Sequence, residues 1–188
     1  MKKSVIIAIV VVSIVLIIGG FFTVKYNSIV SKEEGVKTSE SNIGTNLKRR
    51  ADLIPNLVNT VKGYSVHEQS AIDSVTTARE KMVDSNNVND KLKANDELSN
   101  SISKLMLIVE NYPELKANVN FIQLQDELAG TENRIAVSRK DYNDSVQEYN
   151  SYIKKFPNNI IAKMFNFGTI EYFKADESVN EVPEVTFE

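Results

Sequence analysis

The residues that most often do chemistry are sparse in this sequence. The only histidine is His67, and although Glu68 follows it, the helical zinc motif H-E-x-x-H needs a second histidine where Ala71 stands. The chain has no cysteine, which excludes thiol nucleophiles, thiolate metal sites and disulfides. No phosphate-binding loop, dinucleotide fingerprint or serine-nucleophile elbow occurs. We therefore expect no catalytic residue, metal or cofactor, and we interpret His67 as a solvent-facing helix residue.

Charged side chains give two weaker signals. An acid pair such as Asp126 and Glu127 could act as general acid and base in a hydrolase, but on an amphipathic helix such pairs usually form a solvated face. Lys48, Arg49 and Arg50 form the one basic cluster, which either binds a partner or is simply solvated. The formal net charge of the whole chain is −3, so nucleic acid is not an expected partner.

The beginning of the chain predicts a membrane anchor. Lys2 and Lys3 precede residues 5–24, which contain no charged side chain. As a helix, such a stretch spans about 30 Å, the thickness of the hydrocarbon core of a bilayer. A cleaved signal peptide fits less well, because its apolar region is shorter and ends in a small-x-small site, where this chain has Ile18. We expect residues 1–25 to be an uncleaved, single-pass anchor in the cell membrane, with residues 5–24 in contact with the lipid bilayer.

Beyond the anchor, apolar residues recur at helical spacing in three seams, over residues 29–82, 98–112 and 121–156. The third seam is the most regular, because a large apolar residue recurs at every seventh position: Phe121, Leu128, Ile135, Tyr142, Tyr149 and Phe156. A seven-residue repeat of this length is typical of long helices packed at shallow angles, as in coiled coils. We therefore predict an all-α fold, in which the anchor precedes a rod-like antiparallel bundle of three long helices over residues 26–168.

Prolines and polar residues mark the expected helix ends. The polar residues 84–90 predict the turn between the first and second helices. Pro113 closes the second helix, and Pro157 ends the third and can begin a short final helix. Asn120, with Gln123 three residues later, resembles a capping box for a third helix of about 36 residues. These signals divide the bundle into three helices and a short fourth.

Pro55 interrupts the first predicted helix. Either Asp52 caps a new helix with Pro55 in its first turn, or one continuous helix is kinked at the proline. Leu47 and Ile54 keep the seven-residue phase across this position, which favours the continuous helix. The basic residues nearest the anchor favour the bundle on the outer side of the membrane.

Two further patterns concern the third helix and the end of the chain. Asparagine and tyrosine alternate along the helix: Asn133, Tyr142, Asn143, Tyr149, Asn150 and Tyr152. Either the tyrosines lie at bundle seams with asparagines setting the register at their edges, or the pattern forms a polar groove for a partner helix. Residues 169–188 hold six acids against Lys174 alone, with no helical period, and we predict an acidic, disordered tail there.

Residues 48–58 (KRRADLIPNLV) resemble the LemA family of bacterial membrane proteins. Agreement continues in further segments: 61–64 (VKGY), 67–68 (HE), 112–118 (YPELKAN), 131–136 (TENRIA), 142–143 (YN), 149–150 (YN) and 156–157 (FP). The chain departs from the family where an Ala-Trp pair usually precedes the basic cluster, because Ser39, Glu40 and Ser41 stand there. The resemblance implies an N-terminal membrane helix, an antiparallel helix bundle and no established enzymatic activity.

The residues that match the family's motifs form a candidate interaction surface: Arg49, Arg50, Asp52, Pro55, Asn56, Glu132 and Asn133. Packing and hydrogen bonds between helices explain the same residues equally well. We expect a membrane-anchored, non-enzymatic scaffold or adaptor of the cell envelope, whose partner is another membrane or envelope protein. The alternative is a structural membrane protein that forms a homo-oligomer through a helix seam. A hydrolase that uses an acid pair comes third.

Overall fold

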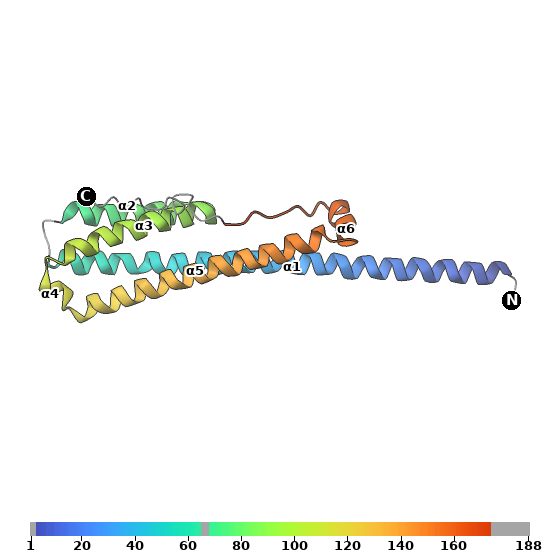
Figure 1. Cartoon of the computed structure of the whole chain (residues 1–188), viewed down its shortest axis with the longest axis horizontal. Coiled ribbons are helices and arrows are strands. Elements are labelled where there is room, and N and C mark those ends of the chain that lie inside the picture. Colours follow the sequence, from blue (N-terminus) through green and yellow to red (C-terminus); the bar gives the residue numbers. More distant parts are fainter. Residues whose placement is uncertain (1–2, 65–67, 174–188) are drawn as a thin grey trace, which may run out of the picture. The chain divides into compact units, whose positions relative to one another are not determined.

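The computed structural model describes residues 3–64 and 68–173, and these form helices and no strand (Figure 1). The helices are α1 (Lys3–Lys62), α2 (Gln69–Asp84), α3 (Val88–Val109), α4 (Pro113–Lys116), α5 (Val119–Lys154) and α6 (Asn158–Met164). The all-α prediction is confirmed. His67 and residues 174–188 of the predicted tail lie outside the described residues, so the expectations for them stay predictions.

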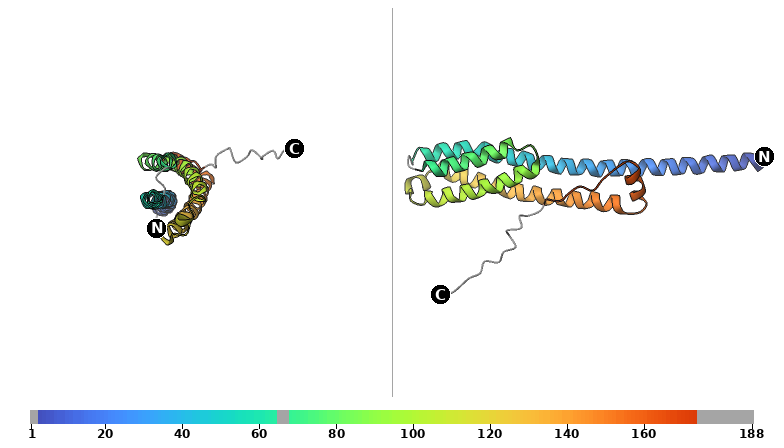
Figure 2. Two further views of the ribbon diagram at one scale, coloured as in Figure 1. Left: turned by 90° about the vertical axis from the view of Figure 1, so that its left-hand side faces the viewer. Right: turned by 90° about the horizontal axis from the view of Figure 1, so that it is seen from above.

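The chain divides into two compact units. The first contains Met1–Lys32 and Tyr142–Glu188, and the second is Glu33–Asp141, so that α1 and α5 contribute residues to both. In the second unit α2 and α3 lie alongside the parts of α1 and α5 that belong to it (Figure 2). The boundaries at residues 25 and 168 that we predicted from the sequence differ from this division and stay predictions.

Interhelical contacts establish the antiparallel order within the second unit. Asn46 Nδ2 on α1 donates to Ser138 Oγ on α5 at 2.9 Å. On the neighbouring hairpin of α2 and α3, Lys81 Nζ and a Glu97 carboxylate oxygen are 2.8 Å apart. From the Asn46–Ser138 pair to the Arg50–Glu132 pair, the residue number rises on α1 and falls on α5. Lys81, near the end of α2, meets Glu97 in the first half of α3. Both arrangements are antiparallel.

The seven-residue repeat of α5 forms the core, as predicted. Five of its six members are buried: Phe121, Leu128, Ile135, Tyr142 and Tyr149. Phe156 is the exception, with 81 % of its surface exposed, because α5 ends at Lys154 before the repeat is complete. The seam therefore predicts packing only where the helix continues.

The first predicted helix is two helices. α1 ends at Lys62 and α2 begins at Gln69, although the apolar seam continues in the sequence from Val61 to Ile72. Both residues are buried. α2 folds back beside α1, and the apolar stripe of α2 faces the same core. The apolar spacing in the sequence therefore continues from one helix to the next and does not indicate where α1 ends.

α1 remains helical through Pro55, as the seven-residue phase indicated. A proline at this position leaves the carbonyl of Ala51, four residues earlier, without its helical N–H donor. Arg79 on α2 supplies a replacement, because its Nε donates to the Ala51 carbonyl oxygen at 2.8 Å. Asp52 is therefore not the cap of a new helix.

The cap of α5 is Asn118 and not Asn120, which corrects the prediction of a capping box. The side-chain oxygen of Asn118 accepts hydrogen bonds from the backbone N–H groups of Asn120 at 2.9 Å and Phe121 at 3.2 Å. The helix begins at Val119 and contains 36 residues, as expected. The other breaks fall near the prolines, because Pro113 begins α4 and Pro157 precedes α6.

α1 is long and apolar enough to cross a membrane, and none of its most apolar stretch is buried. Large side chains from Ile6 to Val24 are exposed around the helix, as a lipid-facing helix requires. The sequence prediction of one apolar N-terminal helix is confirmed by length and composition.

Candidate functional site

Two residues of the predicted interaction surface, Arg50 and Glu132, meet inside the second unit. Arg50 lies on α1 and only 4 % of it is exposed. Its Nη1 forms a salt bridge with Glu132 Oε2 on α5 and lies 2.5 Å from Asn95 Oδ1 and 2.9 Å from Ser99 Oγ on α3. Since Nη1 carries two hydrogens, the three acceptors share them. One cation thus joins three helices.

The electrostatic surroundings of Arg50 are mixed. Burial lowers the pKa of its guanidinium, Glu132 and Asp96 raise it, and Arg139 lowers it again. An arginine nevertheless stays protonated in a protein, so a full positive charge sits within the bundle. Arg139 itself binds Asp96, with Nη2 and Oδ1 2.8 Å apart. These residues make a charged layer across α1, α3 and α5 that fixes their register.

A cavity of about 300 Å³ adjoins this layer, with Arg50, Ser99, Gln125 and Glu132 among its lining residues. It contains serine hydroxyls but no histidine or lysine that would activate them. Among residues 3–64 and 68–173, no group of three His, Cys, Asp or Glu side chains could hold a metal ion. The contacts that the structure shows there are the hydrogen bonds of Arg50 with Asn95 and Ser99 and its ion pair with Glu132.

The other predicted surface residues do not join Arg50. Arg49 forms an exposed salt bridge with Glu127, with 3.0 Å between Nη2 and Oε2. Asp52 lines a groove on another side of α1. The remaining three are exposed: Pro55, Asn56 and Asn133. The structure thus brings together only Arg50 and Glu132 of the predicted surface. The other five residues are exposed at separate positions.

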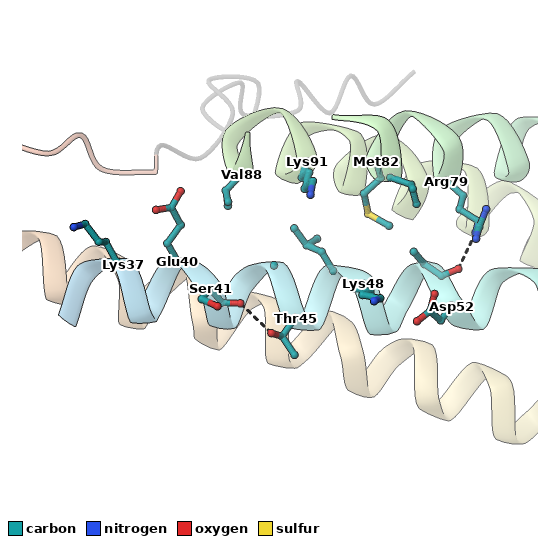
Figure 3. A pocket seen from close by; sticks show the side chains of 14 residues that line it. Lys37, Glu40, Ser41, Thr45, Lys48, Asp52, Arg79, Met82, Val88 and Lys91 are labelled. Atoms are coloured by element: carbon teal, nitrogen blue, oxygen red, sulfur yellow. Dashed lines mark hydrogen bonds between the residues drawn. The ribbon is translucent and has the colours of Figure 1, made fainter. Parts of the chain in front are cut away.

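The groove that Asp52 lines has a volume of about 670 Å³ and lies between α1 and the adjoining ends of α2 and α3 (Figure 3). Its lining includes five apolar residues: Leu47, Ala51, Met82, Val83 and Val88. Six charged residues line it, four cationic and two acidic: Lys37, Lys48, Arg79, Lys91, Glu40 and Asp52. The groove therefore offers apolar contact together with an excess of positive charge.

Sequence reasoning found only one side of this groove. Lys48 belongs to the basic cluster and Asp52 to the predicted surface, and both are on α1. Arg79 and Lys91 come from the α2–α3 hairpin. The sequence carried no signal for them, because their place depends on how far along α1 the hairpin lies.

The first unit contains a second polar arrangement, which we call the asparagine ladder: Asn143 and Asn150 of α5. Asn150 Nδ2 donates to the Ile170 carbonyl at 2.8 Å, and its Oδ1 accepts from the Ile170 N–H at 2.9 Å. Asn143 binds Phe173 in the same way, at 3.0 and 2.9 Å. Asn143 and Asn150 are seven residues apart, which is a rise of about 10 Å along a helix. Their partners Ile170 and Phe173 are three residues apart, which is also about 10 Å along an extended chain. The two asparagines therefore have the spacing that their backbone partners require.

The neighbouring tyrosines reinforce this contact. The hydroxyl of Tyr149 donates to the carbonyl of Gly168 at 3.0 Å, and that of Tyr142 donates to the carbonyl of Glu171 at 3.2 Å. Both tyrosine side chains are buried, as the seam interpretation proposed. The asparagines, however, bind an extended segment of the same chain. Residues 169–173, which we assigned to a disordered tail, are therefore ordered along α5.

Comparison with known proteins agrees with this architecture. The model of the LemA family matches residues 39–187, most of the chain. The chain belongs to the LemA family. Together with the exposed apolar stretch of α1, this membership indicates a membrane-associated protein.

The LemA-family chain is also similar to individual proteins. It is 25 % identical over 207 residues to the magnetosome protein MamQ 2 of Paramagnetospirillum magneticum, covering 95 % of this chain and 76 % of the relative. It is 25 % identical over 170 residues to the protein LemA of Metamycoplasma hominis, covering 87 % of this chain and 76 % of that protein. Both matches extend over most of each chain.

Proposed function

We propose that this LemA-family protein is a membrane-anchored, non-enzymatic scaffold of the cell envelope. The groove between α1 and the α2–α3 hairpin would bind a segment of another membrane or envelope protein. The groove is the observation on which the proposal depends, because it combines an apolar wall with charged side chains at its edge. Binding sites for partner segments commonly have this composition.

The charges in the groove specify the partner further. Lys37, Lys48, Arg79 and Lys91 outnumber Glu40 and Asp52. A partner segment with acidic side chains beside apolar ones would therefore fit better than a basic one. Arg79 is already bound to the Ala51 carbonyl, and Lys37 forms a salt bridge with Glu34 at 2.8 Å. We therefore assign Lys48 and Lys91 to the partner.

The charged layer around Arg50 supports a structural role. Its ion pairs and hydrogen bonds join α1, α3 and α5.

The membrane orientation follows from the anchor. A basic flank on its N-terminal side, Lys2 and Lys3, favours a bundle on the outer side of the membrane.

The proposal can be tested by photo-crosslinking in living cells with the full chain. A photoreactive amino acid replaces Thr45, an exposed residue of the groove, and in a matched control it replaces Gln123, an exposed residue of α5 outside the predicted surface. We expect position 45 to capture a specific envelope protein that position 123 does not. The capture should be lost in the Lys48→Glu/Lys91→Glu variant.

Two results would contradict the scaffold. Identical captures from both positions, or captures that survive the charge reversal, would show that the groove is not the binding site. Capture of a second copy of this chain alone would replace the scaffold with the self-associating structural protein.

A further inference from the structure

The end of α5 and the short helix α6 expose an unusual number of large apolar side chains. Four are exposed: Phe156, Ile160, Met164 and Phe165. Ile160 and Met164 are four residues apart, so they are neighbours on one face of α6. The opposite face is buried through Ile161 and Ala162. We call the four exposed residues the apolar tip.

Basic residues lie close to the apolar tip in the sequence. Lys154, Lys155 and Lys163 are exposed, and no acidic residue occurs between Glu148 and Glu171. This local excess of positive charge contrasts with the formal net charge of −3 for the whole chain. An exposed apolar face with lysines around it is the composition of segments that lie in a membrane interface.

Aromatic contacts place the tip beside the membrane anchor. The ring of Tyr26 on α1 lies 4.8 Å from the ring of Phe165 and 5.7 Å from that of Phe167, measured between centroids. α6 accordingly lies next to α1 in both views (Figures 1 and 2). Tyr26 follows Val24, the last residue of the apolar stretch, by about 3 Å along the helix.

A second contact joins α5 to the same turn of α1 that carries Tyr26. Lys25 Nζ lies 5.7 Å from the ring centroid of Tyr152, in the last turn of α5. The headgroup region of a bilayer is about 5–8 Å thick on each side. If residues 5–24 span the hydrocarbon core, Tyr26 and the residues that contact it therefore lie at the depth of the lipid headgroups. Tyrosine is enriched at this depth in membrane proteins.

We propose that the apolar tip is a second membrane contact. Phe156, Ile160, Met164 and Phe165 insert into the interface of the same bilayer that α1 crosses. Lys154, Lys155 and Lys163 bind the anionic headgroups around them. The two contacts hold the end of α5 at the bilayer surface, so the first unit is attached to the membrane at two points. This inference rests on the membrane anchor of the proposed function and is independent of the groove.

The absence of cysteine makes a direct test possible, because each introduced cysteine is the only one in the chain. Ile160→Cys carries an environment-sensitive fluorophore at the tip, with Met164→Cys as a second tip position. Val137→Cys is the matched control, an exposed apolar residue on α5 in the other unit. Val12→Cys reports on the anchor. Each full-length protein is reconstituted as one chain per nanodisc containing brominated phosphatidylcholine.

We expect the brominated lipid to quench the fluorophores at positions 160 and 164 several-fold more than that at position 137. Quenching at both tip positions as weak as at position 137, with position 12 quenched, would overturn the tip contact and leave the anchor intact. A failure to quench position 12 would overturn the anchor and the tip contact together. One chain per disc removes burial by a second copy as a cause.

The lysines are tested by adding phosphatidylglycerol to the nanodiscs. Quenching at position 160 should increase with this anionic lipid, and the increase should be lost in the Lys154→Gln/Lys155→Gln/Lys163→Gln variant. If anionic lipid has no effect on either protein, the headgroup contact is wrong. All three side chains are exposed, so the replacements leave the packing of α5 and α6 unchanged.

Discussion

Arg79 donates a hydrogen bond from Nε to the carbonyl oxygen of Ala51, over a distance of 2.8 Å. That carbonyl is the one which Pro55 deprives of its helical donor, and the donor comes from a neighbouring helix. The proline, which alone would break or bend α1, thereby becomes a specific attachment point for α2. Arg79 also lines the groove, so the attachment fixes one wall of the proposed binding site.

Arg79→Met should destabilise the bundle by about 1–3 kcal/mol, because the Ala51 carbonyl is left without a partner. In a Pro55→Ala background the same change should cost less, since the alanine introduced there supplies the helical N–H. Urea unfolding followed by circular dichroism in detergent measures both values. Arg134→Met is the control, and its exposed side chain predicts a change below about 0.5 kcal/mol. If Arg79→Met lowers the free energy of unfolding equally in both backgrounds, the stabilising role of Arg79 is not its hydrogen bond to the Ala51 carbonyl.

Glu132→Met should cost about 2 kcal/mol, because it leaves the buried charge of Arg50 with neutral acceptors only. The expectation is reduced from that for a fully buried pair, since the Glu132 side chain is 41 % exposed. Adding Arg50→Met should recover part of this loss, because the buried charge is then gone. Arg49→Met, which removes the exposed partner of Glu127, should change the free energy of unfolding by about 0.5 kcal/mol or less. A double variant less stable than Glu132→Met would contradict this account.

Asn118→Ala should destabilise the start of α5 by about 1 kcal/mol, the usual value of a helix cap. Asn120→Ala should have little effect, because the side chain of Asn118 accepts the two hydrogen bonds at this end. Thermal unfolding of the two variants compares them directly. The reverse order of stabilities would restore the capping box that the sequence indicated.

Asn143→Ala should release the extended segment without unfolding the bundle. Its loss removes both hydrogen bonds to the backbone of Phe173, and amide hydrogen exchange at residue 173 should accelerate roughly tenfold. Asn133→Ala is a matched control, because Asn133 is an exposed asparagine on the same helix. Exchange measured by mass spectrometry on the full chain gives the comparison. Unchanged exchange at residue 173 would mean that the aromatic contact with Tyr142 suffices to hold the segment.

Much of the fold could be predicted because a seven-residue repeat has a direct physical meaning. Leu128 and Ile135 are buried since residues seven apart face the same side of a helix. The repeat could not predict where α1 ends, because α2 continues the same seam from the opposite direction. It also could not distinguish Asn118 from Asn120 as the cap, since both lie near the start of the helix by sequence alone.

The candidate site was less predictable, for a different reason. Arg50 and Glu132 could be selected from the sequence, but their pairing depends on the register between α1 and α5. The groove depends in addition on where the α2–α3 hairpin lies along α1. Asn143 and Asn150 were recognised as a pattern on α5. Their partners, the backbone groups of Ile170 and Phe173, carry no side-chain signal that sequence analysis could have found.

The asparagine ladder contacts main-chain atoms, which every amino acid possesses. Ile170 could therefore change type over evolution while both hydrogen bonds to Asn150 persisted. Phe173 is constrained further, because its ring lies 4.1 Å from that of Tyr142. In a deep mutational scan, position 170 should tolerate many residue types, whereas position 150 should accept little besides asparagine.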